Sequence, residues 1–336
     1  MNTKSNILVD KFEREHTYLR ISITERCNFR CTYCMPAQGI QLSPKSHIMT
    51  YDEIYTVAKK FVDLGVTKIR ITGGEPLVRK DVEIVLKKLA TLPVELSITT
   101  NGVLIDKYIA IFKECNLQKI NISIDSLNPT KFNSITRRKD FEKVMNNIQL
   151  FTNDPFFKVK LNCVLMKETN DDEIIDFIEY TRYNNLNLRF IEFMPFDGNK
   201  WNLDKLVSLE TITQMATNHF GNDHIIKLQD APNDTSKNYQ IKGATGSFAV
   251  ISTVTNPFCD SCNRIRLTAN GMLKNCLFSG GETNLLETLR AGGSIEKPIN
   301  IAVQSKKKVR GGMDTQDKFT SDNLRLNNRS MIAIGG

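Results

Sequence analysis

Residues 18–34 read YLRISITERCNFRCTYC, a strand-like run that passes directly into a loop with three cysteines. These cysteines, Cys27, Cys31 and Cys34, are separated by three and then two residues. Thiolates this close on one polar loop can surround an inorganic centre, whereas they cannot easily form useful disulfides. Iron–sulfur cubes usually take four cysteine ligands, so a set of three leaves one iron free to bind another molecule. The stretch predicts a reactive iron–sulfur centre at the end of a strand.

Structural zinc is the alternative interpretation of this loop. Zinc requires a fourth nitrogen or sulfur ligand at a characteristic spacing. The nearest histidines, His16 and His47, fit no such pattern. The spacing therefore favours an iron–sulfur centre, while the zinc interpretation stays open on the residues alone.

The composition is that of an ordinary soluble globular protein. Of the 336 residues, 40% are hydrophobic and 24% are charged, and no apolar run approaches the length of a membrane helix. The polar N-terminus shows no secretory signal. Eight cysteines without an export signal predict reduced thiolates in a cytoplasmic protein. A net charge of +8 permits nucleic acid, but equally a polyphosphate or another acidic small molecule.

Short β-rich runs alternate with helical patterns up to about residue 194. The expected strands are 18–23, 68–71, 94–99, 119–124, 158–165 and 186–193, with helices near 52–64, 81–91, 104–115, 141–152 and 171–182. Strand–helix units in series form right-handed crossovers and a parallel sheet. A full (βα)8 barrel has eight units, so these six predict an α/β fold with a partial (βα)6 TIM-like barrel over residues 1–194.

The pattern changes after residue 194. A turn-rich stretch is followed by a helix candidate near 208–219, a loop or hairpin arm at 229–242 and a mixture of short strands and helices. We expect residues 195–336 to form a smaller α+β region that packs across the barrel and closes it.

Polar residues occupy alternate positions in four of the expected strands. These positions are Arg20, Ser22, Lys68, Arg70, Asn121, Ser123, Lys160 and Asn162. Helices must cover the apolar strand faces, so the polar faces turn inward. Such a lumen is costly unless it holds water or a polar, anionic ligand. An open sheet with these faces in solvent is the alternative, but the repeated basic residues favour a large polar substrate cavity.

A second set of three cysteines lies far downstream, at Cys259, Cys262 and Cys276. No histidine follows His224, so a zinc site would again lack its fourth ligand. Two sets that are each one ligand short suggest two clusters, each with an open iron. The remaining cysteines, Cys115 and Cys163, fit apolar patterns and are interpreted as packing residues.

An arginine pair close to the second set suggests an anionic substrate, and the end of the chain suggests a tail that enters a cavity. Arg264 and Arg266 follow Cys262 in a strand-like run, where both side chains would share one face and form a fork suited to phosphate or carboxylate. The chain ends with Gly335-Gly336 after the apolar run 331–334. Terminal glycines usually fray. The apolar lead-in suggests instead that this tail is tied down, and an end without side chains could enter a narrow cavity.

The motif at residues 72–76, TGGEP, follows the second expected strand and precedes a helix. Its two glycines let the backbone approach a ligand closely. Together with the first cysteine loop, the motif resembles the radical S-adenosylmethionine (SAM) enzymes. That resemblance implies that the open iron binds the amino and carboxylate groups of SAM, with the Gly-Gly-Glu-Pro backbone against the amino group. Reduction of the sulfonium would release a 5′-deoxyadenosyl radical that abstracts a substrate hydrogen.

More narrowly, the chain resembles the GTP 3′,8-cyclase family of molybdenum cofactor biosynthesis. The resemblance runs from Asp10 to the terminal Gly-Gly and is carried by both cysteine sets, the run 259–266 (CDSCNRIR), the run 190–194 (FIEFM) and the tail. It implies two [4Fe–4S] clusters, the first cleaving SAM and the second binding the guanine base of GTP. The radical would take the ribose 3′ hydrogen, and the resulting carbon radical would add to guanine C8, giving (8S)-3′,8-cyclo-7,8-dihydroguanosine 5′-triphosphate.

The same resemblance assigns contact residues. The positions that match SAM contacts are Tyr33, Gly74, Ser123 and Met194. Those that match GTP contacts are Arg20, Arg70, Thr99, Lys160, Arg264, Ile265 and Arg266. The resemblance also implies that the Gly-Gly tail reaches the active site, and that a homodimer, an electron donor protein and the next enzyme of the pathway are partners. The chain departs from the family at Glu13, where a glycine is expected, and nothing is transferred to the loosely matching region 291–319.

Two other functions stay open on the sequence. One is a radical SAM enzyme that modifies peptides and carries an auxiliary cluster, although the basic inward face favours an anionic substrate. The other is a zinc-containing nucleic-acid-binding protein. It would need a continuous outer basic stripe with exposed aromatic residues, which the sequence does not show. We therefore expect neither nucleic acid nor a membrane as a partner.

Overall fold

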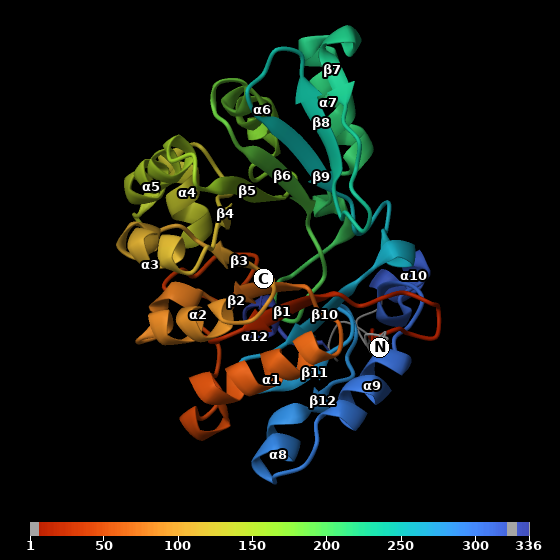
Figure 1. Cartoon of the computed structure of the whole chain (residues 1–336). Coiled ribbons are helices and arrows are strands. Elements are labelled where there is room, and N and C mark those ends of the chain that lie inside the picture. Colours follow the sequence, from red (N-terminus) through yellow and green to blue (C-terminus); the bar gives the residue numbers. More distant parts are fainter. Residues whose placement is uncertain (1–6, 321–327, 336) are drawn as a thin grey trace, which may run out of the picture.

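The computed structural model describes residues 7–320 and 328–335 (Figure 1). Its first six strands are β1 (Tyr18–Ser22), β2 (Lys68–Thr72), β3 (Glu95–Thr100), β4 (Lys119–Ser123), β5 (Lys158–Leu165) and β6 (Asn187–Glu192). The helices between them are α1 (Tyr51–Asp63), α2 (Val82–Ala90), α3 (Ile109–Glu114), α4 (Pro129–Thr136), α5 (Phe141–Asn153) and α6 (Ile174–Tyr183). Each strand pairs in parallel with the next, which confirms the predicted strand–helix series.

The C-terminal part of the chain adds strands to both edges of this sheet. The strands β9 (Ser247–Ile251), β8 (Lys237–Ile241) and β7 (Ile225–Lys227) continue from β6, and β10 (Arg264–Leu267), β11 (Met272–Lys274) and β12 (Thr283–Asn284) continue from β1. Because β9 and β10 pair in parallel with β6 and β1, the parallel part of the described sheet has two strands more than the six predicted. Its outer strands, β7 and β12, are not paired with each other, so the barrel is partial, as expected.

The remaining helices are α7 (Leu209–Phe220), α8 (Leu285–Arg290), α9 (Glu296–Gln304), α10 (Gln316–Thr320) and α12 (Met331–Ile334). Figure 1 shows that the C-terminal elements lie at both ends of the curved sheet, where they extend it rather than form a separate layer. The division at residue 194 therefore does not separate two sheets and stays a prediction. No helix in the described ranges is long and apolar enough to cross a membrane.

The main core lies between the apolar strand faces and the surrounding helices. Helix α1 illustrates the pattern, because Ile54, Val57, Ala58 and Phe61 form a fully buried stripe at helical spacing. Its start is stabilised by a capping box, in which the Thr50 side chain accepts a hydrogen bond from Glu53 N–H and the Glu53 side chain accepts one from Thr50 N–H. With the apolar faces covered by helices, the polar strand faces point to the inside of the barrel.

A second apolar cluster lies under the C-terminal tail. Phe196, Trp201, Phe278 and Phe319 pack there with Ile334, which is 1% exposed. The Trp201 indole N–H donates a hydrogen bond to Phe193 O at 2.8 Å. This cluster holds α12 against the barrel, so the apolar lead-in to the terminal glycines is tied down, as expected.

Glu13 stands where the family resemblance predicts a glycine, and its backbone keeps a conformation that glycine favours. Glu13 adopts a φ of 63°, in the left-handed region where glycine is favoured. The turn is held by Asp10, whose carboxylate accepts hydrogen bonds from Phe12 N–H at 2.9 Å and Arg14 N–H at 3.2 Å. The glycine conformation is thus retained at Glu13, and hydrogen bonds to Asp10 stabilise it.

Gly246 lets the chain entering β9 approach the end of α6, and its replacement should destabilise the fold. A Cβ at this position would lie 2.4 Å from Asn184 O and 2.5 Å from Leu186 O. We expect Gly246→Ala to lower the free energy of unfolding by about 1–3 kcal/mol, because the backbone must move to make room. Denaturant unfolding of the full chain measures this. Gly281→Ala is the control, since a Cβ there meets no atom within 4 Å. Equal stability of the two variants would contradict the prediction.

Candidate active site

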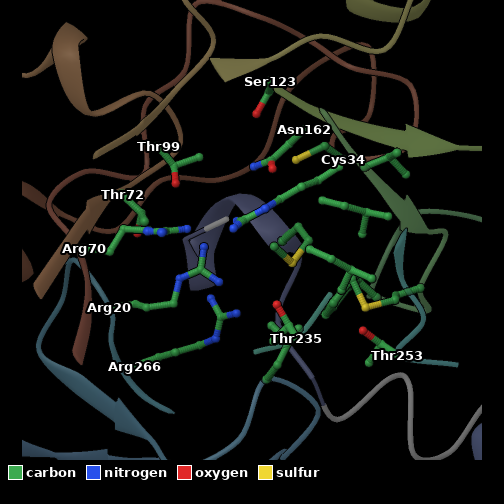
Figure 2. A pocket seen from close by; sticks show the side chains of 18 of the residues that line it. Arg20, Cys34, Arg70, Thr72, Thr99, Ser123, Asn162, Thr235, Thr253 and Arg266 are labelled. Carbon is green, nitrogen blue, oxygen red and sulfur yellow. The ribbon is translucent and has the colours of Figure 1, made fainter. Parts of the chain in front are cut away.

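A large cavity opens on the inner face of the barrel. Its volume is about 520 Å³, within the usual range for a small-molecule site. All six strands from β1 to β6 contribute to its wall, together with the C-terminal loop 231–235 and both cysteine sets. Figure 2 shows Arg20, Arg70 and Arg266 on one side of this space, with Thr99, Ser123 and Asn162 further around the wall. The inward polar face predicted from strand alternation is therefore present.

Three arginines form a row on adjacent strands. The register pairs Arg20 of β1 with Arg266 of β10 on one side and with Arg70 of β2 on the other. None of the three forms a salt bridge with a carboxylate of the described residues. Burial lowers the pKa of Arg266 to about 10, and burial together with the neighbouring Arg266 lowers that of Arg20. This row, which we call the arginine row, is a concentrated positive charge suited to an anionic ligand.

Several buried polar atoms of the wall have no hydrogen-bond partner among the residues that the structure describes. They are Tyr18 Oη, Arg20 Nε, Thr99 Oγ1, Asn162 Oδ1, Asn263 Oδ1 and Arg264 Nη1, and all belong to residues that line the cavity. Leaving a buried donor or acceptor unpaired costs roughly 1–3 kcal/mol. The wall is therefore complete only with a polar ligand that pairs with these atoms.

The first cysteine set lies on the loop after β1 and lines the cavity. Cys27, Cys31 and Cys34 are free and half-buried. The loop is held from the end of α4, where Arg30 N–H donates to Thr136 O at 3.0 Å and Arg138 Nε donates to Asn28 O at 2.7 Å. Helix α4 was not predicted, although Asn128 before Pro129 is a recognisable start signal and its side chain caps the helix.

The two glycines of the TGGEP motif bring neighbouring loops into contact. A Cβ at Gly73 would lie 2.8 Å from Thr24 O, and one at Gly74 would lie 2.5 Å from Arg26 O. The N–H of Gly74 donates to Thr24 O at 2.8 Å, and no hydrogen bond within the described residues uses the Gly73 or Gly74 carbonyl. The motif therefore locks the loops after β1 and β2 together and leaves carbonyl oxygens for a ligand ammonium.

Glu75 extends this connection to the loop after β3. Its carboxylate accepts hydrogen bonds from Asn101 N–H at 2.6 Å and from the Thr100 hydroxyl at 2.8 Å. Burial raises the pKa of Glu75 to about 7. Glu75 therefore links three loops beside Cys27.

The four residues matched to SAM contacts, Tyr33, Gly74, Ser123 and Met194, all line the cavity. Tyr33 is oriented by a hydrogen bond from its hydroxyl to Asp125 Oδ2 at 2.8 Å. Asp125 in turn accepts a hydrogen bond from Val164 N–H at 2.9 Å, and burial raises its pKa to about 6.

The second cysteine set lines the same cavity as the first. Cys259 lies just before β10 and Cys276 just after β11, so the pairing of these two strands brings them together with Cys262. Burial raises the pKa of Cys259 and Cys276. Burial also acts on Cys262, but the charges of Lys306 and Arg264 outweigh it and lower the pKa of that thiol. Both cysteine sets therefore line one cavity, which the sequence alone did not establish.

Most residues matched to GTP contacts, namely Arg20, Arg70, Thr99, Arg264 and Arg266, line the cavity. The other two matched residues, Ile265 and Lys160, do not line the cavity. The side chain of Ile265 is 1% exposed and packs in the main core, because alternation along β10 turns it away from its arginine neighbours. Lys160 does not line the cavity, although its charge interacts with Arg189 and Asp234 of the wall. Burial lowers the pKa of Lys160 to about 7, with Arg189 acting in the same direction.

The C-terminal tail contacts the arginine row. Arg266 Nη1 donates a hydrogen bond to Gly335 O at 2.7 Å. Gly335 has a φ of 89°, and a Cβ there would lie 2.6 Å from Thr72 Oγ1 and 2.8 Å from Ser22 Cβ. Only glycine fits this position without displacing β1 and β2. Gly336 lies outside the described residues.

Sequence reasoning missed three charged residues of this region. Arg189 lines the cavity from β6, where its alternation with Asn187 and Ile191 could have revealed it. Lys306 and Arg310 lie against the second cysteine set, and Arg310 also lines the cavity. No local signal distinguished these two from the surrounding surface lysines.

Comparison with known proteins agrees with this geometry. Residues 21–181 match the family model of the radical SAM superfamily, and residues 186–311 match that of Molybdenum Cofactor Synthesis C. The chain is 46% identical over 340 residues to the mitochondrial GTP 3′,8-cyclase of Arabidopsis thaliana, covering 100% of this chain and 85% of the relative. It is 39% identical to the GTP 3′,8-cyclase of Listeria welshimeri, covering 98% of this chain and 99% of the relative.

Other relatives are longer. The chain is 42% identical to molybdenum cofactor biosynthesis protein 1 of Homo sapiens over 98% of its own length, but it spans only 51% of that protein. In fold it is similar to Streptococcus suis SuiB bound to S-adenosylmethionine, with a TM-score of 0.60 at 17% identity, covering 98% of this chain and 79% of that one. An end-to-end match at 39% identity is decisive for descent. The chain belongs to the GTP 3′,8-cyclase family of the radical SAM superfamily.

Proposed function

We propose that this protein is a radical SAM GTP 3′,8-cyclase that converts GTP to (8S)-3′,8-cyclo-7,8-dihydroguanosine 5′-triphosphate, an early step of molybdenum cofactor biosynthesis. The observation that carries this proposal is that two sets of three cysteines and the arginine row line one cavity. This arrangement supports a SAM-cleaving cluster and a site for a polyanionic nucleotide in one cavity. The names of the Arabidopsis and Listeria relatives support the same activity.

The first cysteine set fits a [4Fe–4S] cluster that also binds SAM. Within the described residues, no three His, Cys, Asp or Glu side chains are arranged to hold a single metal ion, so the fit rests on the donors and their surroundings. Cys27, Cys31 and Cys34 supply soft sulfur ligands, and the unused carbonyls of Gly73 and Gly74 suit an ammonium group. When bound, cluster and SAM together supply the one-electron chemistry that starts the reaction.

The residues of this chain orient the two ligands. Tyr33 is held by Asp125, and its loop is held by α4, so the first cysteine set keeps its place when ligands exchange. Ser123 and Met194 complete the SAM side of the wall. The apolar cluster under α12 closes one side of the cavity and keeps water from the reacting atoms.

On the substrate side, charge and unpaired polar atoms do the binding. The arginine row, with Arg189 and the nearby Lys160, neutralises the triphosphate. Thr99 Oγ1 and Asn162 Oδ1 provide free polar atoms for the ribose or base. Gly335 O accepts the hydrogen bond from Arg266 and thereby orients its guanidinium.

We assign a second [4Fe–4S] cluster to Cys259, Cys262 and Cys276, with guanine as the ligand of its open iron. The three thiols are free and half-buried, and they line the substrate space. The concentration of arginines beside them favours GTP over a peptide, which is the alternative for a radical SAM enzyme with an auxiliary cluster.

The partners of the enzyme follow from the same assignment. Exposed cations lie at the first cysteine loop, namely Arg26, which precedes Cys27, and Arg137, which donates hydrogen bonds to Arg30 O and Met35 O, and neither is paired with a carboxylate of the described residues. This basic surface supports an acidic electron donor protein as partner. Eight free cysteines support a reduced, cytoplasmic location. The homodimer and the next enzyme of the pathway rest on family resemblance alone.

The direct test is anaerobic incubation of reconstituted protein with SAM, dithionite and GTP, followed by mass spectrometry. We expect 5′-deoxyadenosine together with an isomer of GTP. Formation of 5′-deoxyadenosine without conversion of GTP would keep the radical chemistry and exclude GTP as the substrate. Iron-loaded protein that leaves SAM intact would contradict the assignment of the first cysteine set.

Single cysteine variants should separate the two clusters. We expect about eight irons per reconstituted wild-type chain and about four in either Cys27→Ala or Cys262→Ala, because a [4Fe–4S] cluster is lost with its ligand. Cys27→Ala should abolish SAM cleavage, whereas Cys262→Ala should retain it and lose GTP conversion. Iron assay and 5′-deoxyadenosine analysis measure these outcomes. Cys115→Ala is the control that keeps both clusters. Full iron content in Cys262→Ala would refute the second site.

Arg189→Met should weaken GTP binding without affecting SAM cleavage. Loss of a charged hydrogen-bond donor costs about 1.5–3 kcal/mol, or roughly ten- to a hundredfold in Kd. Anaerobic calorimetry with GTP measures the change. Arg182→Met is matched to it, since Arg182 lies on α6 and pairs with Glu179 at the surface. Equal affinities of the two variants would remove Arg189 from the binding site.

The pKa of Lys160 predicts a pH dependence of GTP affinity. In the free enzyme this pKa is about 7, so raising the pH through 7 discharges the ammonium that would attract the triphosphate. We expect the affinity advantage of the wild type over Lys160→Met to fall by up to about tenfold per pH unit above 7. The ratio of the two Kd values between pH 6 and 8.5 isolates this effect, because titration of GTP itself acts on both proteins. A constant ratio would show that Lys160 does not act on GTP through its charge.

A further inference from the structure

Residues 306–310 lie against the second cysteine set, and we call them the strap. Lys306 Nζ lies 3.4 Å from Cys262 Sγ as a hydrogen-bond donor and also donates to Arg264 O at 2.9 Å. At the other end, Arg310 N–H donates to Cys259 Sγ at 3.4 Å. Two of the three thiols therefore receive a hydrogen bond from the strap.

Lys306 is an unusual residue because its charge is buried without a carboxylate partner. It is 2% exposed, and no salt bridge joins it to an acidic residue of the described ranges. One titratable neighbour of Lys306 is His16. Burial and the charge of Lys306 lower the pKa of His16 to about 4, so His16 is neutral at physiological pH. The other titratable groups that face Lys306 are Cys262, whose Sγ accepts its hydrogen bond, and Cys276. An isolated buried ammonium is unfavourable, so these thiolates are its natural counter-charge.

Arg14 fastens the strap to the loop that carries the second cysteine set. Its Nη1 donates to Cys259 O and to Lys308 O, both at 2.8 Å, and its Nη2 donates to Lys307 O at 3.0 Å. Its Nε is paired with Asp10 Oδ2 at 2.7 Å, which offsets its own charge. One guanidinium therefore joins the N-terminal turn, the cysteine loop and the strap.

We propose that Lys306 and Arg14 are positioning residues for the second iron–sulfur centre. The strap supplies a positive charge and two hydrogen bonds to its cysteine thiolates, and Arg14 holds the strap in place. This inference rests on the second cluster proposed above and goes beyond it by naming the residues that tune the centre. Positive charge and N–H···S bonds favour the reduced, more negative state of a cluster. Lys306 therefore raises the reduction potential of the centre and strengthens retention of its iron.

The test uses a full-length parent chain in which Cys27, Cys31 and Cys34 are replaced by alanine, so that only the second centre carries iron. In this parent, Lys306→Met should shift the reduction potential of the second centre to a more negative value. Spectroscopic redox titration measures this shift. Loss of iron to a chelator should become about ten- to a hundredfold faster, as is typical when a partner of a metal ligand is removed. Lys307→Met is the matched control, because it removes the same charge one residue away from an exposed position.

Thermal unfolding of the iron-free chains distinguishes a tuning role from a structural one. In the iron-free chains Lys306 is buried without a carboxylate partner among the described residues, so Lys306→Met should leave the melting temperature unchanged or raised. A lowered melting temperature would make Lys306 a structural residue and overturn the proposal. Arg14→Gln should accelerate iron loss through displacement of the strap, with a smaller shift in potential because Asp10 already balances its charge.

The outcomes separate this proposal from the assignment of the cluster. A parent chain that binds no iron would overturn the second centre and, with it, the role of the strap. The other contrary result is a parent that binds iron while Lys306→Met and Lys307→Met have the same reduction potential and the same rate of iron loss. That result would overturn the proposed role of the strap and leave the second centre in place.

Discussion

Arg266, Arg20 and Arg70 lie side by side on β10, β1 and β2, with no carboxylate of the described residues paired to them. Three like charges at one depth of a barrel repel each other, and their hydration is largely lost. The strands that carry the row are fixed by apolar residues in the main core, and Arg266 also donates a hydrogen bond to Gly335 O. These contacts keep the three arginines in place despite their repulsion. The rest of the site depends on this uncompensated charge. It makes this part of the wall suited to an anionic ligand, and the same cavity is lined by both cysteine sets.

The two cysteine loops are held by hydrogen bonds and close backbone contacts with neighbouring parts of the barrel. Gly73 and Gly74 bring the loop after β2 within hydrogen-bond distance of the loop that leads to Cys27. Glu75 adds the loop after β3. On the opposite side, Arg14 and the strap perform the same task for the second set. Both cysteine loops are thus held by contacts with neighbouring chain segments that do not use up their thiols, which are free.

Sequence patterns were sufficient for the elements whose signal is local. The period-2 alternation in β1, β2, β4 and β5 predicted both the strands and the inward polar face, because side chains of a strand alternate strictly. The same reasoning applied to β6 would have found Arg189. The eight-residue helix α4 was missed, although Asn128 and Pro129 mark its start. Sequence patterns also could not show that β9 pairs with β6 and β10 with β1. In both pairs the two strands are far apart in the sequence, so no local pattern indicates the pairing.

By itself, the sequence determined the identity and spacing of the cysteines, the glycine-rich turn and the paired arginines. Three cysteines on one loop, the TGGEP turn and the Arg-x-Arg run are each contained in a few residues, so their chemistry can be read without a fold. Only the tertiary structure decided which of these features share a cavity. The contacts of Arg266 with Gly335, of Lys306 with Cys262 and of Arg14 with Cys259 join segments that only strand pairing and the buried core bring together. Such proximity is a property of the packed barrel, because no local preference of the chain encodes a contact between distant residues.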